Sequence, residues 1–252
     1  MNIRFDGQVV IVTGAAHGFG REIARRFDEL GATVYACDVL AEELDETRQL
    51  CGPNCRTAVV DVTDPRAVQA FVRDAEAGSG RVHALVNNAG GVLGQTGQPL
   101  EAVQAADWHA ILDVNLTGTF LMAQAVAPAM KRALTGRIVN ISSGAGLGVS
   151  LTGIQAYAAA KAAQIGLTRQ LAHELGPFKI TVNNVAPGFV RSNPTTERQW
   201  QSYGEAGQAA LVARVALRRL GSPADIANAV LFFASDYASW ITGEVLSVAG
   251  GR

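Results

Sequence analysis

The chain of 252 residues has little charge and no strongly basic segment. Charged residues make up 17% of it, and the formal net charge is −1. A surface that binds nucleic acid or an anionic membrane concentrates Lys and Arg, so the sequence predicts neither kind of partner. Apolar runs are short as well: residues 9–12 are typical, and none approaches the roughly 20 residues of a membrane span. We therefore expect a soluble, cytoplasmic protein.

Cysteine and the other metal ligands are also scarce. Three cysteines, an odd number, form no disulfide framework, which agrees with a reducing compartment. Cys51 and Cys55 lie four positions apart, but no second pair of Cys or His residues is near them to complete a zinc site. The four histidines are scattered without ligand spacing: His17, His83, His109 and His173. The sequence predicts no bound metal.

What the chain does have is a regular alternation of two patterns. Short runs rich in Val and Ile, typical of buried strands, alternate with longer segments of helical period. The seven expected strands are residues 9–12, 33–37, 57–60, 84–87, 137–141, 181–185 and 245–248. Hydrophobic residues make up 48% of the chain, enough for a large core. This pattern predicts an α/β fold in one domain, residues 1–252, whose doubly wound parallel sheet has helices on both faces.

A glycine-rich turn follows the first expected strand and opens a helix. Its glycines are Gly14, Gly18 and Gly20, spaced G-x3-G-x-G. Glycines let the backbone turn tightly and approach a pyrophosphate, whose charge favours a helix N-terminus. Because a strand and a helix flank the turn as a dinucleotide-binding motif requires, we expect a dinucleotide here rather than a plain strand–helix connection.

An acidic residue, Asp38, follows the second expected strand, 18 positions beyond Gly20. A carboxylate at this place accepts hydrogen bonds from the adenine-ribose hydroxyls and repels a 2′-phosphate. No Arg or Lys follows at Val39 or Leu40, and His17, the nearest candidate cation, has an ordinary pKa below 7. The alternative is an ordinary loop aspartate. The sequence thus favours NAD over NADP as the cofactor.

Polar groups also end the third and fourth expected strands, at the edge of the sheet where a dinucleotide would lie. These segments are Asp61-Val62 and Asn87-Asn88-Ala89-Gly90. Their polar side chains are able to bond the adenine or to hold loops. For Asn87 a cofactor contact and a structural bond between neighbouring strands are equally supported.

The candidate catalytic pair is Tyr157 and Lys161. A spacing of four on a helix places the phenol and the ammonium on one face. A free tyrosine has a pKa of about 10 and is a poor base at neutral pH. A cation about 4 Å away, in an effective dielectric of about 20, stabilises the phenolate by roughly 4 kcal/mol, or about three pKa units. We therefore expect the pKa of Tyr157 to lie near neutrality, where the residue exchanges protons readily.

Two polar residues join this pair. Ser143, after the fifth expected strand, precedes Tyr157 by 14 positions, far enough for a loop to return its hydroxyl to the phenol. Asn115 lies in an apolar helix segment, where an amide is disfavoured and needs a buried partner. Its structural role would be to stabilise a bend in that helix. Without Ser143 and Asn115, Tyr157 and Lys161 would be interpreted as an ordinary pair on a helix surface.

Together these segments resemble the short-chain dehydrogenase/reductase family, in its compact subgroup, over nearly the whole chain. The matching segments are residues 13–20, 61–62, 87–90, 113–116, 143, 157–161, 186–188, 219–223 and 241–243. Each is weak alone, but their order and spacing are specific. The resemblance, which is to 3-oxoacyl-carrier-protein reductases and to sugar or polyol dehydrogenases, implies a Rossmann fold. It also implies hydride transfer between a nicotinamide and an alcohol or carbonyl substrate, with no metal.

The resemblance also implies the roles of individual residues. Asn115, Ser143, Tyr157 and Lys161 would form a catalytic tetrad. Tyr157 would exchange the proton, Ser143 would hold the substrate oxygen, and Lys161 would bond the nicotinamide ribose and lower the pKa of Tyr157. Asn115 would position a water that connects Lys161 to solvent. The implied cofactor-binding residues are Gly14, His17, Gly18, Phe19, Gly20, Asp38, Asp61, Val62, Asn88, Ala89, Gly90, Tyr157, Lys161, Pro187, Gly188, Val190 and Ser192.

Two positions depart from the family pattern. Ser192 stands where a Thr often meets the nicotinamide carboxamide, and its hydroxyl can do the same. Ala249 stands where an Asp is usual, a change that would affect a C-terminal or subunit contact rather than the chemistry.

Substrate choice is expected from residues 189–218, which resemble the family's mobile lid, and from the loops at 91–99 and 150–155. The candidate substrate residues are Ser143, Gln155, Tyr157, Phe189 and Trp200. A mixed aromatic and polar lining fits a small polar alcohol, such as a sugar, a polyol or a hydroxy acid.

Two other functions are weighed against this one. The first is an NADPH-dependent 3-oxoacyl-thioester reductase, but Asp38 and the lack of a basic patch for an acidic carrier protein speak against it. The second is a catalytically silent dinucleotide-binding protein, and the complete tetrad speaks against that. The resemblance also implies a homo-oligomer, a tetramer or a dimer. Helices rich in Ala, around 108–130 and 156–175, would permit close packing.

Overall fold

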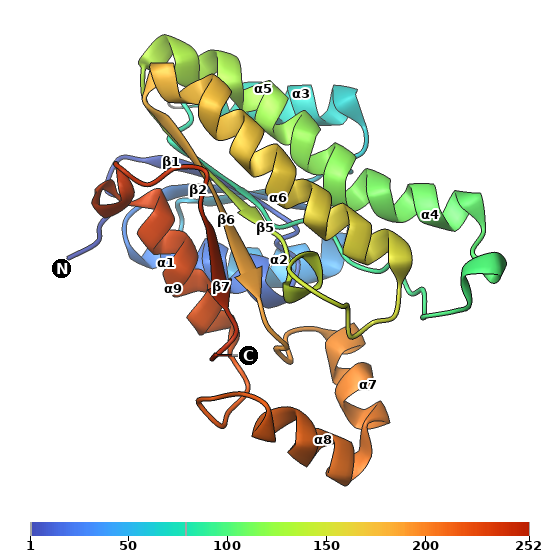
Figure 1. Cartoon of the computed structure of the whole chain (residues 1–252). Helices are drawn as coiled ribbons and strands as arrows, with labels where there is room; N and C mark the ends of the chain where they lie inside the picture. The colour runs from blue at the N-terminus through green and yellow to red at the C-terminus, as the bar shows by residue number, and fades with distance from the viewer. Residues whose placement is uncertain (1, 79, 252) are drawn as a thin grey trace.

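A parallel sheet of seven strands forms the centre of the protein (Figure 1). The computed structural model describes residues 2–78 and 80–251. The strands are β1 (Val9–Thr13), β2 (Thr33–Asp38), β3 (Cys55–Val59), β4 (Ala84–Asn87), β5 (Gly136–Ile141), β6 (Ile180–Pro187) and β7 (Val245–Val248). Their order in the sheet is β3-β2-β1-β4-β5-β6-β7, and each neighbouring pair is parallel. The direction of winding reverses between β1 and β4, so a topological switch point lies at the carboxyl ends of these two strands.

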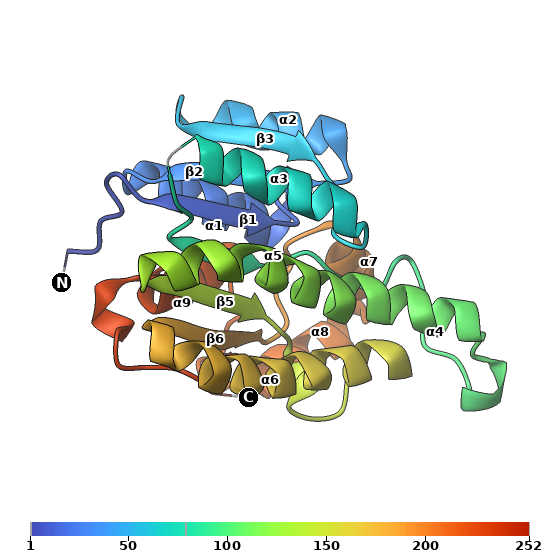
Figure 2. The same ribbon diagram turned by 90° about the horizontal axis from the view of Figure 1, so that it is seen from above.

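Helices cover both faces of the sheet (Figure 2). On one face lie α1 (Gly18–Glu29), α2 (Ala41–Leu50) and α9 (Pro223–Ala234); on the other lie α3 (Pro65–Ala77), α5 (Gly118–Ala133) and α6 (Gln155–Leu175). Strands and helices alternate along the chain, as the sequence pattern predicts. The expected doubly wound Rossmann-type α/β fold is confirmed.

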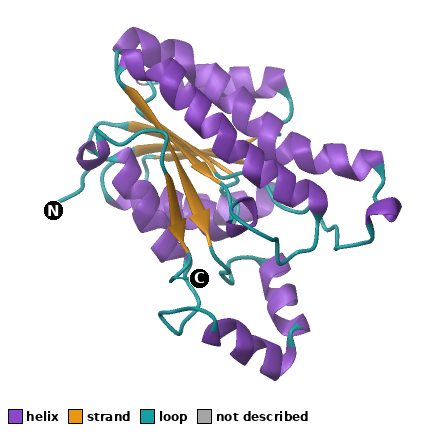
Figure 3. Ribbon diagram, in the orientation of Figure 1, coloured by secondary structure: helices purple, strands orange, loops and turns teal. Residues whose placement is uncertain are grey.

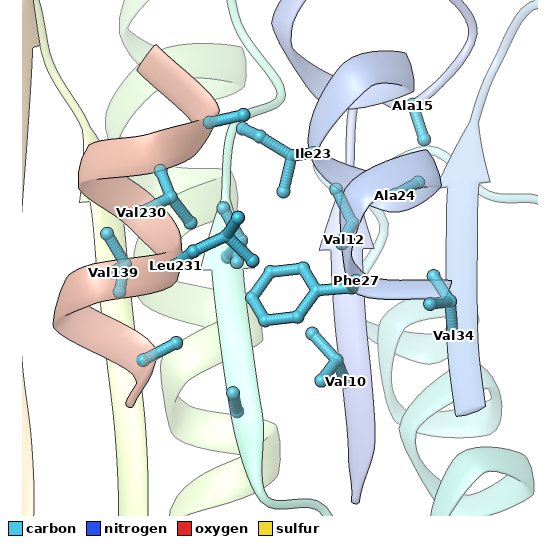
Figure 4. Packing of buried hydrophobic residues seen from close by; sticks show 14 of the residues in the cluster. Val10, Val12, Ala15, Ile23, Ala24, Phe27, Val34, Val139, Val230 and Leu231 are labelled. Carbon is cyan, nitrogen blue, oxygen red and sulfur yellow. The ribbon is translucent and has the colours of Figure 1, made fainter. Parts of the chain in front are cut away.

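The side chains of β1 divide between two cores, because successive residues of a strand point to opposite faces. Val10 faces the layer of α1 and α9, where Phe27 of α1 and Leu231 of α9 pack beside it (Figure 4). Phe27 is fully buried and meets Phe5 edge to face, with ring centroids 4.7 Å apart. Ile11 faces the opposite layer. Burying one such side chain stabilises the fold by about 1.5–3 kcal/mol, so both helical layers are firmly attached to the sheet.

Most element boundaries agree with the sequence pattern. Helix α1 begins at Gly18, and Gly31, just beyond its end, has a φ of 94°. That backbone conformation is the one for which glycine is preferred after a helix, as expected for this position. Strand β3 begins two residues before the expected residue 57, and β6 continues two residues past 185, to Pro187.

A π-helical turn joins two apolar helices, the second of which lies on one face of the sheet. Helix α4 (Ala105–Leu112) continues through η2 (Asp113–Thr117) into α5. By length and composition the segment Ala105–Ala133 is apolar enough to cross a membrane, which corrects the expectation that no segment approaches this limit. The core helix of a soluble protein passes the same test, and α5 packs against α3, β4 and β5.

Two helices project beyond the carboxyl edge of the sheet (Figure 3). They are α7 (Pro194–Ser202) and α8 (Gly204–Ala213), and both fall within residues 189–218, the segment expected to form a lid. Asn193 begins α7 with a capping box that it forms with Thr196. Short helices occupy other connections: η1 (Leu100–Ala102), η3 (Gly144–Gly146), η4 (Gly176–Phe178) and η5 (Asp236–Ala238).

Candidate active site

The glycine-rich turn after β1 leaves no room for side chains. Gly14 and Gly18 have φ values of 65° and 59°, which L side chains rarely adopt. A Cβ on Gly14 would lie 2.7 Å from the Cα of Ala89, and a Cβ on Gly20 would overlap the carbonyl oxygen of Gly14. The turn therefore packs tightly between the start of α1 and the end of β4. A bare backbone at a helix N-terminus is a cradle for a pyrophosphate.

The start of α1 and Asp38 border the same turn. His17 gives α1 no side-chain cap, so it leaves the first N–H groups of the helix without that partner. One Asp38 oxygen accepts a hydrogen bond from the Ala16 N–H at 3.0 Å; the other accepts from Val39 and Leu40 at 2.7 and 3.2 Å. The carboxylate is thus held beside the turn, and its remaining lone pairs suit ribose hydroxyls. These residues fit a dinucleotide.

Asn88 fastens the glycine-rich turn to the end of β4. Its side-chain nitrogen donates to the carbonyl oxygens of Thr13 and Gly14 at 3.0 and 2.8 Å. The Thr13 hydroxyl accepts hydrogen bonds from the N–H groups of Asn88 and Ala89 at 3.1 and 3.0 Å. Asn88 therefore shapes the turn. Thr13 is absent from the expected site residues; its signal is a hydroxyl at the end of a Val- and Ile-rich strand.

The other polar strand ends differ in what they contact. Asn87 is buried, and its side-chain nitrogen donates to Asn140 Oδ1 at 2.9 Å, so it bonds β4 to β5. This is the structural one of its two expected roles. Asp61 is exposed, with one oxygen accepting from the N–H and the hydroxyl of Thr63 at 2.8 Å each. Val62 is buried against α5. Asp61 therefore keeps an oxygen open to solvent.

The segment after β4 also reaches the expected catalytic residues. Gly90 has a φ of 150°, and a Cβ there would lie 2.5 Å from Asn115 Oδ1 and 3.4 Å from Lys161 Nζ. Asn115 is fully buried in the π-helical turn. Its side-chain nitrogen donates to the carbonyl oxygens of Gly91 and Ile111 at 2.8 Å each, and its oxygen accepts from the Gly91 N–H at 3.0 Å. Asn115 thus has the buried partners that an amide in an apolar helix segment requires. Its hydrogen bonds stabilise the π-helical turn.

Tyr157 and Lys161 share one face of α6, as their spacing predicts. The Nζ of Lys161 lies 5.7 Å from the centroid of the Tyr157 ring. Ser143, which begins η3 after β5, forms a hydrogen bond that acts on the Tyr157 hydroxyl, and its oxygen also accepts from the Ala145 N–H at 3.1 Å. The loop between β5 and α6 therefore returns Ser143 to the phenol. Four side chains from three segments, Asn115, Ser143, Tyr157 and Lys161, are gathered at one place.

The pKa values of the pair differ from the sequence expectation. Burial raises the pKa of Tyr157 above its usual value, and the hydrogen bond with Ser143 offsets only part of this. Burial also lowers the pKa of Lys161 to about 7. For the protein by itself, the expectation of a Tyr157 pKa near neutrality is therefore wrong. Lys161 is buried and Tyr157 is partly buried, and an amine that is only partly charged at pH 7 stabilises a phenolate weakly.

Apolar side chains surround Tyr157. It packs against a small buried cluster that contains Ile111 and Ile154, and Val92 and Trp108 pack against the same cluster. These residues come from the loop after β4, from α4 and from the segment before α6. Tyr157 thus has apolar neighbours besides the polar residues gathered around it.

The segment after β6 leads from the sheet to the lid. The Gly188 N–H donates to the Val248 carbonyl of β7 at 3.0 Å, and a Cβ on Gly188 would lie 2.9 Å from the Cα of Ala249. Ala249, one of the two unusual positions, therefore packs directly on Gly188. A Cβ on Gly18 would lie 2.9 Å from the carbonyl oxygen of Ser192. The start of the lid thus touches the glycine-rich turn.

Four further expected residues lie around this edge. Pro187 ends β6, and Val190 is buried and forms a parallel bridge with Gly221. Phe19 lies half-buried in the first turn of α1, against the core. Gln155 begins α6, and its side-chain nitrogen donates to the carbonyl of Gln98 at 2.9 Å. Gln155 therefore holds the loop before η1.

The aromatic residues of the lid contact one another. Phe189 stacks on Trp200, with ring centroids 6.1 Å apart and an interplanar angle of 28°, and Tyr203 lies 5.9 Å from Phe189. Arg191 lies over the Trp200 ring at 5.5 Å and forms a 2.8 Å ion pair with Glu197. Phe189 and Trp200, two of the expected substrate residues, thus belong to one aromatic cluster.

Gln164 and Thr119 contact the site although the expected residues include neither. Gln164 Oε1 accepts a hydrogen bond from Lys161 Nζ at 3.1 Å, and Gln164 Nε2 donates to the Thr119 hydroxyl at 2.7 Å. The available signal is a polar residue one turn after Lys161 in an Ala-rich helix. It is the same kind of signal that identified Asn115.

A glycine-rich turn at the switch point of a doubly wound sheet, with a Tyr, a Lys, a Ser and an Asn beside it, defines a dinucleotide-dependent oxidoreductase. Residues 14–252 match the family described as enoyl-(acyl carrier protein) reductase. The chain belongs to the short-chain dehydrogenase/reductase family, as the sequence resemblance implies.

Individual relatives cover nearly the whole chain. It is 42% identical to the (2S)-[(R)-hydroxy(phenyl)methyl]succinyl-CoA dehydrogenase subunit BbsD of Thauera aromatica, over 97% of this chain and 96% of that one. It is 38% identical to the 3-oxoacyl-[acyl-carrier-protein] reductase FabG of Thermotoga maritima, over 99% of each chain. The structure of a 7α-hydroxysteroid dehydrogenase complexed with NADH and 7-oxo glycochenodeoxycholic acid matches with a TM-score of 0.89 and 35% identity, over 99% of this chain and 96% of that one. The protein is thus an oxidoreductase that acts on CH–OH groups.

Proposed function

We propose that the protein is an NAD(H)-dependent oxidoreductase that interconverts a secondary alcohol and a ketone, with Tyr157 as the acid/base. The observation that carries the proposal is the segment after β4. Ala89 packs on Gly14 of the glycine-rich turn, and the next residue, Gly90, packs on Asn115 and Lys161. A dinucleotide whose pyrophosphate lies on the turn therefore extends toward Tyr157.

Each member of the tetrad has a distinct task in alcohol oxidation. Bound NAD supplies the hydride acceptor and a positive charge. Tyr157 takes the proton of the substrate hydroxyl, and Ser143 donates a hydrogen bond to the substrate oxygen. Lys161 bonds the ribose and stabilises the phenolate. Because burial raises the pKa of Tyr157, proton transfer near neutral pH depends on the positive charges beside it.

Asp38 supports NAD over NADP. Its carboxylate is held beside the turn by three backbone N–H groups, where it would repel a 2′-phosphate. Fluorescence titration with NADH and with NADPH tests this directly. We expect NADH to bind at least about tenfold more tightly than NADPH does. In Asp38→Ala the ratio of the two dissociation constants should be smaller. NADPH binding as tight as NADH binding would contradict the preference.

A small polar secondary alcohol, such as a polyol, sugar or hydroxy acid, is the first substrate candidate. Arg191 supplies a charged group over the Trp200 ring of the lid's aromatic cluster, and Gln155 supplies an amide at the start of α6. A panel of such alcohols with NAD, followed by the absorbance of the reduced cofactor, tests it. If NADH binds but the panel and its ketones show no turnover, the alternative of a catalytically silent dinucleotide-binding protein gains support.

A 3-oxoacyl or 3-hydroxyacyl thioester is the second substrate candidate, and two observations favour it. The relatives named above include a subunit of a [hydroxy(phenyl)methyl]succinyl-CoA dehydrogenase and a 3-oxoacyl-carrier-protein reductase. Tyr157 also packs against an apolar cluster, which suits an acyl or aryl group better than a sugar. Reduction of acetoacetyl-CoA by NADH or NADPH, set against the polyol panel, distinguishes the two candidates.

We also propose that the protein forms a homo-oligomer. Trp240 and Val149 are 98% and 97% exposed, which is unusual for large apolar side chains. Light scattering combined with size exclusion tests this; a monomer at micromolar concentration would contradict it.

A further inference from the structure

Lys161 is a buried amine with two protein partners. It is 4% exposed, and its Nζ donates to the Ile141 carbonyl at 2.9 Å and to Gln164 Oε1 at 3.1 Å. An ammonium has three N–H groups. Two are therefore directed into the protein, and the third is left for the side where Gly90 approaches Nζ.

The orientation of the Gln164 amide follows from the chemistry of its other contact. The Thr119 hydroxyl has one hydrogen, which it donates to the Asn115 main-chain carbonyl at 2.9 Å. It can therefore only accept from Gln164, whose Nε2 lies 2.7 Å away. With the amide nitrogen facing Thr119, Oε1 must face Lys161. One chain of hydrogen bonds thus connects Lys161, Gln164, Thr119 and the Asn115 carbonyl.

Beyond Lys161, the side chains of this chain of bonds are buried and uncharged. Gln164 is fully buried and Thr119 is 3% exposed. Burying an amide is unfavourable unless it is hydrogen-bonded, so Gln164 has few alternatives to this arrangement. Tyr157 is the titratable group in contact with Lys161, with its ring 5.7 Å from Nζ. Burial is the cause that lowers the pKa of Lys161, and no charged side chain among the described residues offsets it.

We propose that Gln164 is a positioning residue of the active site. Through Thr119 it ties Lys161 to the main-chain carbonyl of Asn115, and it holds Nζ so that one N–H is left for the substrate and cofactor side. The proposal rests on the proposed function, in which Lys161 acts on the ribose and on Tyr157. The family resemblance implies that Asn115 positions a water that connects Lys161 to solvent. The chain through Gln164 and Thr119 is a separate connection, made by two side chains, between Lys161 and the main chain of Asn115.

The arrangement has a consequence for the charge of Lys161. An amide oxygen stabilises the ammonium by a hydrogen bond, whereas a carboxylate at the same place would add a full opposite charge. Gln164→Leu should therefore make Lys161 harder to protonate, and Gln164→Glu should make it easier. A residue that only fills space would shift neither.

The chain has three lysines, Lys131, Lys161 and Lys179, so the Lys161 amine can be titrated directly by NMR. The protein is labelled with ¹³C at the lysine Cε, and the signals are assigned with Lys131→Arg and Lys179→Arg. We expect Gln164→Leu to lower the titration midpoint of Lys161 by about one pH unit, and Gln164→Glu to raise it by about one to three. Thr119→Val, which removes the anchor of Gln164, should lower it by less than Gln164→Leu does.

Thr168→Val is the matched control. Thr168 is another buried residue of α6 whose hydroxyl is hydrogen-bonded, but it has no side-chain bond to Lys161. The Thr168→Val change should leave the titration midpoint of Lys161 unchanged. If the midpoint stays the same in folded Gln164→Leu and in Gln164→Glu, the proposal is overturned. If Gln164→Leu unfolds, the direction of the shift in Gln164→Glu and in Thr119→Val decides.

A kinetic measurement then separates this proposal from the proposed function. With any alcohol that turns over, Gln164→Leu should lower kcat and displace the pH profile, and Gln164→Glu should displace the profile the opposite way. The lysine titration needs neither substrate nor cofactor. If no dehydrogenase activity is found, the proposed function is contradicted, but the lysine titration still tests the role of Gln164.

Discussion

The buried polar side chains around Lys161 and the polar side chains of the lid differ in how they are held. The first form a network between distant segments, and the second form local, exposed pairs. The buried network comprises Asn87, Asn115, Thr119, Asn140, Lys161, Gln164 and Thr168, each joined to others of the set or to the backbone. These residues come from β4, β5, η2, α5 and α6. In the lid, by contrast, Arg191 pairs with Glu197 six residues away, and both are exposed.

The difference concerns how strongly each region depends on the rest of the fold. A buried polar group that loses its partner keeps the full desolvation penalty. The network is therefore stable only when every member is positioned to form its hydrogen bonds. An exposed pair that separates is simply solvated again. The network thus holds the side chains to which we assign proton transfer in one arrangement. The lid depends less on the rest of the fold, which suits the substrate selection that we propose for it.

Tyr157→Phe tests the comparison with the largest expected effect. Removing the hydroxyl removes the proposed general acid/base, so kcat should fall by about 100- to 10,000-fold while NADH still binds. Stopped-assay turnover and NADH fluorescence measure the two quantities. Tyr203→Phe in the lid, whose hydroxyl accepts from Gln199 at 2.7 Å, is the control and should alter kcat only slightly. Equal losses from both changes would erase the distinction between the regions.

The pH dependence of stability tests whether Lys161 is neutral in the folded protein above pH 7. Burial lowers its pKa to about 7, whereas in the unfolded chain it stays protonated up to about pH 10. Between these values the unfolded state binds more protons, so this residue makes the free energy of unfolding rise with pH. Relative to Lys161→Met, the wild type should gain about 1.4 kcal/mol per pH unit across this window.

Urea unfolding of both proteins at pH 7, 8 and 9 measures that difference. Below pH 7 both states are protonated and the difference should be constant. A difference that stays flat up to pH 9 would mean that Lys161 is charged in the folded protein.

Asn140→Ala compares the two regions by stability. Asn140 accepts from Asn87 and donates to Thr168 at 2.9 Å each, so truncation leaves buried groups without partners. We expect a loss of about 2–3 kcal/mol in the free energy of unfolding, measured by urea denaturation. Gln199→Ala in the lid should cost about 0.5 kcal/mol or less. The comparison fails if the lid variant is the more destabilised of the two.

Arg191→Ala has the smallest expected effect. It removes the exposed ion pair with Glu197 and the contact with the half-buried Trp200 ring, so the free energy of unfolding should fall by at most about 1 kcal/mol. Thermal unfolding at low and high NaCl checks this, because salt should reduce the difference further. A loss of several kcal/mol would show that the lid is an integral part of the core.

The elements and residues predicted correctly depend on local patterns. The alternation of Val-rich runs and helical segments identifies all seven strands, since burial on both faces of a parallel strand leaves a continuous apolar run in the sequence. The spacing of Tyr157 and Lys161 determines that they share one helix face. Gly31 predicts the end of α1 because its backbone conformation is local.

Other properties depend on which segments the fold brings together. Gln164 lies one turn beyond Lys161, but its role appears only when Thr119 and the carbonyl of Asn115 are brought beside it. The raised pKa of Tyr157 and the lowered pKa of Lys161 follow from burial, which no spacing along a helix reveals. The sequence by itself therefore determines the order of the elements and which residues are candidates for the active site. Only the tertiary structure decides their protonation and their partners, because desolvation and long-range hydrogen bonds arise from packing.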